Sequence, residues 1–340
     1  MRNFIRHIDP LASLINEKAN KLFGLLTALP VHELGLPPHC LNYFLKSHYH
    51  RLFFSVETSA RLLYLALRDQ PERRERKVVM DYGAGVGSLY LLAKMIGCYV
   101  IYNDLLEDWK ISARLIAEAC QVKIDEYIVG DIDATLDVLQ TRQLSCDIIT
   151  SRNVIEHIYK PEDFFNSIRA RQPWAAIYSS TTANYYNPAA HLQHIRWHRK
   201  CERRYVAQRA AIILEKLPAL PAAALKKLAK ATRGLAGKEL ENAIENFEKG
   251  MLPVPKKFYT NTCDPSNGVW AEHLLTFEQY RLLIGEELFQ IRFLPGFWDT
   301  HYSNPLKSAM GAVFNRIINK GGKRAFRLAP FIYVIAQPRA

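Results

Sequence analysis

A glycine-rich turn is the most specific chemical pattern in this sequence. The segment 81–87 reads Asp-Tyr-Gly-Ala-Gly-Val-Gly, and it lies between a short apolar run and an amphipathic stretch that begins near Leu89. Glycines let the backbone bend sharply and approach a ligand without a Cβ in the way, and the following helix start offers unpaired N–H groups. A dinucleotide-binding turn has the spacing G-x-G-x-x-G, whereas here Ser88 stands where the third glycine would fall. The turn therefore predicts a nucleoside-containing ligand and weighs against a nicotinamide oxidoreductase.

Polar residues also follow the next three predicted strands. Asp104 ends the second strand, where a carboxylate can accept hydrogen bonds from both hydroxyls of a ribose. Asp131 ends the third strand, where a carboxylate can accept from an adenine amino group, and Asn153 follows the fourth strand. The alternative for Asp104 and Asp131 is that each caps the helix that follows it.

Strands that alternate with helices must position these residues. Such alternation predicts an α/β fold with a doubly wound, mostly parallel sheet of seven strands, whose carboxyl ends form the ligand crevice. Amphipathic helices are expected between the strands, including 107–120, 134–140, 161–171 and 276–288. The seven strands are expected at 78–80, 98–102, 127–129, 146–150, 174–180, 289–297 and 330–337.

The four motifs together resemble those of the class I S-adenosylmethionine (SAM)-dependent methyltransferases. The segment 146–157 is similar to the ubiquinone-biosynthesis-like branch (methyltransferase type 11 and 12), in which V-[IL]-E-H follows the fourth strand. The resemblance covers about residues 77–181 and again about 273–337. It implies a Rossmann-like fold, SAM as the cofactor and methyl transfer as the activity.

The resemblance also implies roles for individual residues. The turn residues would line the methionine end of SAM, Asp104 would hold the ribose, Asp131 and the backbone of Ile132 would hold the adenine, and Asn153 would lie beside the sulfonium. The complete set of predicted cofactor-binding residues is Asp81, Gly83, Ala84, Gly85, Gly87, Asp104, Leu105, Asp131, Ile132 and Asn153.

Histidines are the candidate bases. Methyl transfer to a soft acceptor needs mainly alignment, but a hydroxyl acceptor must also lose its proton to a base. His157 lies in the fourth-strand motif, His191 and His194 follow the fifth strand, and His273 lies where the core pattern resumes. We expect one of the four to be the base, with His273 ahead. The alternative for each is a packing or capping role.

The same segment contains two residues that could bind a metal ion. Some relatives, including small-RNA 2′-O-methyltransferases and a ubiquinone-pathway enzyme, carry E-x-x-E-H and bind a divalent ion. This chain has Asn153 in place of the first glutamate, so that only Glu156 and His157 are left. Two ligands do not make a site, and we expect no metal. Glu156 would then cap or form a local ion pair.

Charge and organisation limit the acceptor. The chain has 340 residues and a formal net charge of +12, which favours acidic ligands. Residues 1–76 are expected to form a helical cap, 77–182 the SAM-binding core, 183–275 a basic helical insertion over the acceptor side, and 276–340 the last two strands with a basic tail. The basic residues of the insertion are Arg196, Arg199, Lys200, Arg203, Arg204, Lys226, Lys227 and Lys230, and those of the tail are Lys320, Lys323, Arg324 and Arg327.

The hypothesis at this stage is O-methylation of a sugar, a glycan or a small acidic metabolite. The alternatives are an RNA methyltransferase that uses the basic helices for phosphate contacts and a non-catalytic SAM-binding regulatory subunit. The basic tail, with its nearby apolar residues, is also a candidate for peripheral contact with an anionic membrane. The six cysteines form no C-x-x-C pair and no apolar run resembles a signal peptide, so we expect a cytoplasmic protein. The oligomeric state is not predicted.

Overall fold

A seven-stranded sheet forms the centre of the molecule. The computed structural model describes residues 3–70, 76–254 and 261–339, and the strand order in the sheet is β3-β2-β1-β4-β5-β7-β6. β1 to β5 are parallel, and β7 runs antiparallel to both of its neighbours, β5 and β6. The predicted fold class is therefore confirmed. The strands are β1 (Val78–Tyr82), β2 (Tyr99–Asp104), β3 (Glu126–Val129), β4 (Ile148–Arg152), β5 (Ala176–Thr181), β6 (Phe289–Pro295) and β7 (Ile332–Pro338).

Helices cover both faces of the sheet, because side chains that alternate along a strand point to opposite faces. In β1, Val79 packs into a core with the N-terminal helices, whereas Val78 and Met80 pack into the core on the other face. The first face carries α1 (Pro10–Thr27), α3 (Leu52–Arg68), α4 (Leu89–Met95) and α5 (Glu107–Ala119), and the second carries α6 (Ile132–Thr141), α7 (Pro161–Arg171) and α11 (Phe277–Ile284).

Several boundaries lie one to four residues from the expected ones, and two of these differences have a clear local reason. The helix expected over 276–288 begins after Thr276, which forms a capping box with Gln279, but it ends at Ile284. Gly285 then adopts φ +90°, a left-handed conformation that stops the helix. The strand expected over 174–180 starts at Ala176 instead, because Trp174 lies in the preceding turn.

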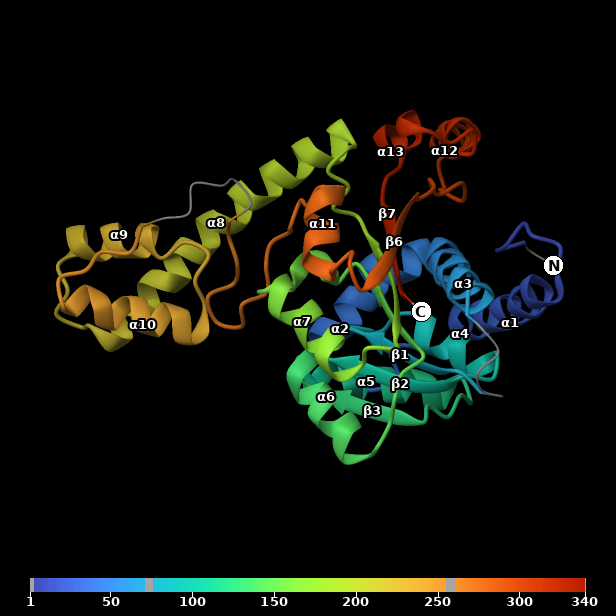
Figure 1. Cartoon of the computed structure of the whole chain (residues 1–340), viewed down its shortest axis with the longest axis horizontal. Helices are drawn as coiled ribbons and strands as arrows, with labels where there is room; N and C mark the ends of the chain where they lie inside the picture. The colour runs from blue at the N-terminus through green and yellow to red at the C-terminus, as the bar shows by residue number, and fades with distance from the viewer. Residues whose placement is uncertain (1–2, 71–75, 255–260, 340) are drawn as a thin grey trace.

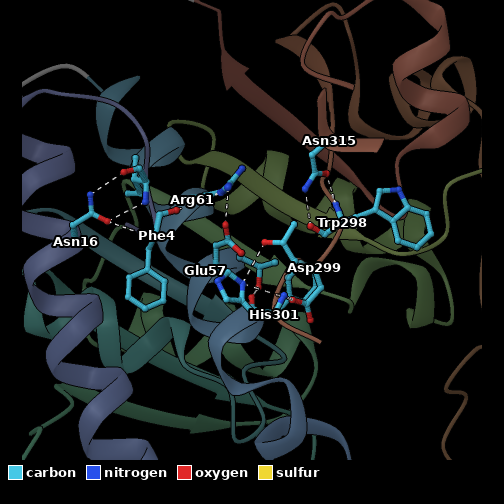
Figure 2. Close-up of polar contacts among 12 residues, drawn as sticks. Phe4, Asn16, Glu57, Arg61, Trp298, Asp299, His301 and Asn315 are labelled. Carbon is cyan, nitrogen blue, oxygen red and sulfur yellow. Dashed lines mark hydrogen bonds and ion pairs between the residues drawn. The ribbon is translucent and has the colours of Figure 1, made fainter. Parts of the chain in front are cut away.

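Polar contacts inside the N-terminal segment hold its own parts together. Asn16 on α1 accepts from the backbone N–H groups of Phe4 and Ile5, at 2.8 and 2.9 Å. On α3, Arg61 bonds Glu57 one turn away, as Figure 2 shows. Between the two helices lie the shorter α2 (Pro38–Tyr43), η1 (Phe44–His48) and η2 (Tyr49–Arg51).

The insertion after β5 is an arm. It contains α8 (Pro188–Lys216), α9 (Ala222–Ala231) and α10 (Gly237–Glu248), and its outer part has a small core of its own around Ile213, Leu228 and Leu240. Figure 1 shows α9 and α10 standing away from the sheet at the far end of α8. A cap formed by the whole of 183–275 stays a prediction. In this conformation the start of α8 and the returning segment near residue 270 lie next to the strand ends.

A second helical insertion lies between the last two strands. It contains α12 (Pro305–Ile318) and α13 (Lys323–Leu328), which Figure 1 shows beyond the ends of β6 and β7. The basic cluster expected in a tail lies here instead: Lys323, Arg324 and Arg327 are on α13, and Lys320 is in the turn before it. The sequence pattern predicts the last strand but does not predict the two helices before it.

Candidate functional site

The glycine-rich turn connects β1 to α4 and requires glycine at particular positions. Gly83 and Gly85 have φ values of +67° and +52°, which side chains disfavour. A Cβ on Gly83 would lie 2.6 Å from Cγ2 of Val154, so the turn packs directly against the segment after β4. Ala84 donates its N–H to the carbonyl of Asn103 at 2.9 Å, which holds the turn against the end of β2.

Asp104 lies beside this turn. Its Oδ2 accepts the backbone N–H of Gly85 at 2.9 Å, and Oδ1 lies 3.4 Å from the N–H of Leu106. The side chain is buried, and this burial raises the pKa of the carboxyl group, while the backbone N–H groups oppose the shift. The N-cap of α5 is Leu106, so Asp104 is not a helix cap. A carboxylate has about four acceptor sites, which leaves capacity for ligand hydroxyls.

Asp131 and Asn153 lie at the ends of the neighbouring strands. Asp131 caps α6 by accepting the N–H of Ala134 at 3.0 Å, so the capping alternative holds for this residue. Its side chain is nevertheless exposed, which leaves the second carboxylate oxygen accessible. Asn153 is exposed, adopts φ +57°, and donates its backbone N–H to Ser180 at 2.8 Å. Ile132 is buried and Leu105 is 41% exposed.

A buried cation that the sequence analysis did not single out lies behind the turn. The guanidinium of Arg152, the last residue of β4, donates to the hydroxyls of Ser55, Thr58 and Ser59 on α3, each at 2.8 Å. No carboxylate forms an ion pair with Arg152 in the described part of the chain. Burial raises the pKa of Asp81 to about 7, and the positive charge of Arg152 partly opposes this shift.

His48 adds a second polar group to the same place. Its Nδ1 lies 3.3 Å from Oγ of Ser55, and its Nε2 is buried and has no hydrogen-bond partner among the described residues. Burial, together with the charge of Arg152, lowers the pKa of His48 to about 3, so the ring is neutral. In the sequence, this cluster is indicated only by the position of Arg152 directly before Asn153, the residue predicted to lie beside the sulfonium. The sequence does not indicate which residues of α3 bind Arg152.

The four candidate bases occupy different environments. Nδ1 of His194 contacts Oε2 of Glu272 at 2.5 Å, and its Nε2 lies 3.1 Å from the carbonyl oxygen of Thr182. Both ring nitrogens therefore face acceptors, an arrangement that a protonated ring satisfies. The pKa of His194 is raised, because the contacts with Glu272 and Thr182 outweigh the opposing effect of burial. This geometry favours the protonated ring over the neutral one, so His194 is poorly suited to accept a proton.

His157 and His273 have ring geometries that suit a base. Nδ1 of His157 lies 2.9 Å from the carbonyl oxygen of Trp270, and Nε2 of His273 lies 2.8 Å from that of Ile158. Each ring must donate to its carbonyl, which places the lone pair on Nε2 of His157 and on Nδ1 of His273. His191 lies apart from them, with Nδ1 3.3 Å from the carbonyl of the exposed Tyr185.

Glu156 is buried among these groups. Its Oε1 lies 3.3 Å from the N–H and 3.4 Å from the hydroxyl of Thr182, whereas Oε2 has no hydrogen-bond partner within the described ranges. Burial raises the pKa of this carboxyl group. No group of three or more His, Cys, Asp or Glu side chains suited to hold a metal ion occurs in the described ranges.

A hollow of about 420 Å³ lies on the outside of α8, next to Glu272. Arg196, Trp197 and Lys200 line it, and the ammonium of Lys200 lies 5.5 Å from the centroid of the Trp197 ring. Neither Arg196 nor Lys200 forms an ion pair with a described carboxylate. Because Glu272 is paired with His194, the hollow has a net positive lining close to the ends of β4 and β5.

Comparison with known proteins points to one family. The family model described as "Methyltransferase domain" matches residues 80–170. No curated protein sequence matches the chain. A structure of the ribosomal protein L11 methylase from Lactobacillus delbrueckii subsp. bulgaricus is 15% identical with a TM-score of 0.29, and the match covers 36% of this chain and 60% of that one.

Two further solved structures are similar at this level. TrmN from Thermus thermophilus is 23% identical with a TM-score of 0.30, over 37% of this chain and 38% of that one. The plantazolicin methyltransferase BpumL, in complex with SAH, is 14% identical with a TM-score of 0.38, over 98% of this chain and 100% of that one. The chain spans less than two thirds of the length of the L11 methylase and of TrmN.

Proposed function

We propose that the chain transfers the methyl group of SAM to an acidic small-molecule or glycan acceptor, and that residues 80–170, which match the methyltransferase domain, bind the SAM. The observation that carries this proposal is the arrangement of the turn and Asp104. The carboxylate lies 2.9 Å from the N–H of Gly85, at the carboxyl edge of a parallel sheet. A nucleoside bound in this crevice would meet a carboxylate that accepts hydrogen bonds from its ribose hydroxyls. It would also meet a turn whose glycines allow close approach of the backbone.

The remaining cofactor contacts follow from the neighbouring strand ends. Asp131 and Ile132 would hold the adenine, and Asn153 would lie near the sulfonium. Arg152 forms no ion pair with a described carboxylate, and its charge, with the neutral His48 beside it, favours the carboxylate of the methionine moiety behind the turn. The burial of this cluster under α3 would also exclude water from the charged end of the ligand.

The acceptor class is proposed from the hollow on α8. An arginine, a lysine and an indole that line one hollow suit a ring that carries a carboxylate or phosphate. Glu272, which pairs with His194, also lines this hollow. The hollow therefore lies near the candidate histidines and not at the distal end of the arm. His157 and His273 are the proposed bases for a hydroxyl acceptor. An RNA substrate would use the same cations for its phosphates, and it is the alternative outcome of a binding assay.

The function is tested by calorimetric titration of SAM into the wild type and into Asp104→Asn. Loss of the charge-assisted bonds to the ribose should weaken binding at least tenfold, which is roughly 1.4 kcal/mol. The matched control is Asp137→Asn, which removes the same charge from an exposed residue of α6 that pairs with Arg171. Equal affinities for SAM in the wild type and Asp104→Asn, or tighter binding of NAD than of SAM, would contradict the proposal. Binding of SAM without turnover on any acceptor would assign a regulatory subunit.

A further inference from the structure

The hairpin of α12 and α13 is held on its inner side by the segment that follows β6. Oδ1 of Asn315 accepts the N–H of Trp298 at 2.7 Å, and its Nδ2 donates to the carbonyl of the same residue at 2.8 Å, as Figure 2 shows. Gly311 lies so close to the segment that follows β6 that a Cβ on it would lie 2.4 Å from the carbonyl oxygen of Asp299. Ile318 is buried at the end of the helix. One side of α12 is therefore fixed in orientation.

The opposite side of α12 presents a regular apolar stripe to solvent. Leu306, Met310, Val313 and Ile317 are spaced i, i+4, i+7 and i+11, so they share one face of the helix. They are 69%, 49%, 52% and 38% exposed, respectively. A stripe of this length, fully formed and facing away from its own core, indicates a surface that is covered in use.

Charge decides what covers it. The sequence from Thr300 to Ala340 contains no Asp or Glu. Lys307 and Arg316 lie on the two flanks of the stripe, about 100° and 80° around the helix from Leu306. The other basic side chains of this insertion are those of Lys320, Lys323, Arg324 and Arg327. A purely basic rim around an apolar stripe fits a surface that is apolar inside and negatively charged outside.

We propose that the exposed face of α12, with the basic residues of α13, binds the surface of an anionic lipid bilayer. α12 would lie in the plane of the interface, with its four apolar side chains among the acyl chains and the lysines and arginines at the headgroup phosphates. No helix in the described ranges is long and apolar enough to cross a membrane. Figure 1 shows α12 and α13 beyond the sheet edge, away from β1 to β3, where a flat surface can reach them.

The test is co-sedimentation of the full-length protein with lipid vesicles. Vesicles of equimolar phosphatidylglycerol and phosphatidylcholine are compared with vesicles of phosphatidylcholine alone, at low and at high salt. We expect binding to the anionic vesicles that weakens with salt, and at least tenfold weaker binding to the neutral ones. The double variant Met310→Glu/Val313→Glu should lower binding to anionic vesicles at least tenfold, and Leu306→Glu should lower it severalfold.

Leu282→Glu is the matched control, because Leu282 on α11 is 81% exposed and lies outside the hairpin. Circular dichroism melting of each variant shows whether it remains folded, and light scattering gives its mass. The proposal is overturned if the wild type does not bind anionic vesicles, or if Leu306→Glu and Leu282→Glu lose binding equally. It is also overturned if the wild type is a dimer that Met310→Glu/Val313→Glu converts to a monomer, since a second copy would then cover the face.

Discussion

Substitution of Gly83 by alanine should test how the turn and the segment after β4 fit together. Two penalties act on the new side chain. The φ of +67° costs an alanine about 1 kcal/mol relative to glycine, and the Cβ would lie 2.6 and 2.7 Å from the two methyl carbons of Val154. Overpacking of this kind costs typically about 1–3 kcal/mol. We therefore expect Gly83→Ala to lower the free energy of unfolding by about 2–4 kcal/mol.

Gly35 provides a control that separates the two penalties. It has almost the same φ, +68°, but no atom lies within 4 Å of the position that its Cβ would take. Gly35→Ala should therefore show the backbone penalty alone, about 1 kcal/mol. The assay is urea unfolding followed by circular dichroism, with titration of SAM into each folded variant. Gly83→Ala should also weaken SAM binding more than tenfold, because the turn must shift, whereas Gly35→Ala should leave the affinity unchanged.

A second substitution locates the strain. Val154→Ala removes both methyl carbons and leaves only the Val154 Cβ at 3.2 Å from the new atom. In a double-mutant cycle, Val154→Ala should therefore cost less in the Gly83→Ala background than in the wild type, by about 1 kcal/mol or more. If Gly83→Ala destabilised the protein no more than Gly35→Ala, or if the two substitutions were additive, the close packing described for this turn would be wrong.

Three other predictions follow from the candidate site. An acceptor is first found by screening acidic sugars and metabolites. With this acceptor, His157→Ala or His273→Ala should lower turnover roughly 10²–10⁴-fold and leave the affinity for SAM unchanged. Near-wild-type turnover in both variants would exclude the proposed bases. Lys200→Glu should raise the KM for an anionic acceptor at least tenfold. Arg199→Glu makes the same change of charge outside the hollow and should leave the KM unchanged. Equal effects of the two substitutions would show that the hollow does not bind the acceptor. Burial lowers the pKa of His198 to about 4, so between pH 6.5 and 4 the unfolded chain binds a proton that the folded chain does not. This residue by itself should lower the free energy of unfolding by about 2 kcal/mol from pH 8 to 5, in addition to the effect of His48, whose pKa is also lowered. His198→Gln should give a shallower decline in urea unfolding, and an unchanged slope would refute the lowered pKa of His198.

The core fold could be predicted from the sequence because its signals are local. Apolar runs such as Val78 to Met80 and the alternation of strands and helices determine a covered parallel sheet, and this part of the prediction is confirmed. The glycines of the turn were identifiable because φ values above zero and close packing demand a missing Cβ at those positions. The positions of Asp104 and Asn153 beside that turn then follow from the topology, since parallel strands end at the same edge.

Only the tertiary structure decided which side chains meet across long separations in sequence. Arg152 bonds Ser55, and His194 pairs with Glu272, because packing of α3 and of the returning segment brings them together, and no local pattern encodes such pairs. The same holds for the choice among the histidines, whose suitability depends on which carbonyl oxygen each ring faces. The stripe on α12 shows the limit most directly. Its spacing is visible in the sequence, but a face of Leu306, Met310 and their neighbours is ordinarily buried. Here the opposite face, with Gly311 and Asn315, packs against the segment at residues 298–299 instead.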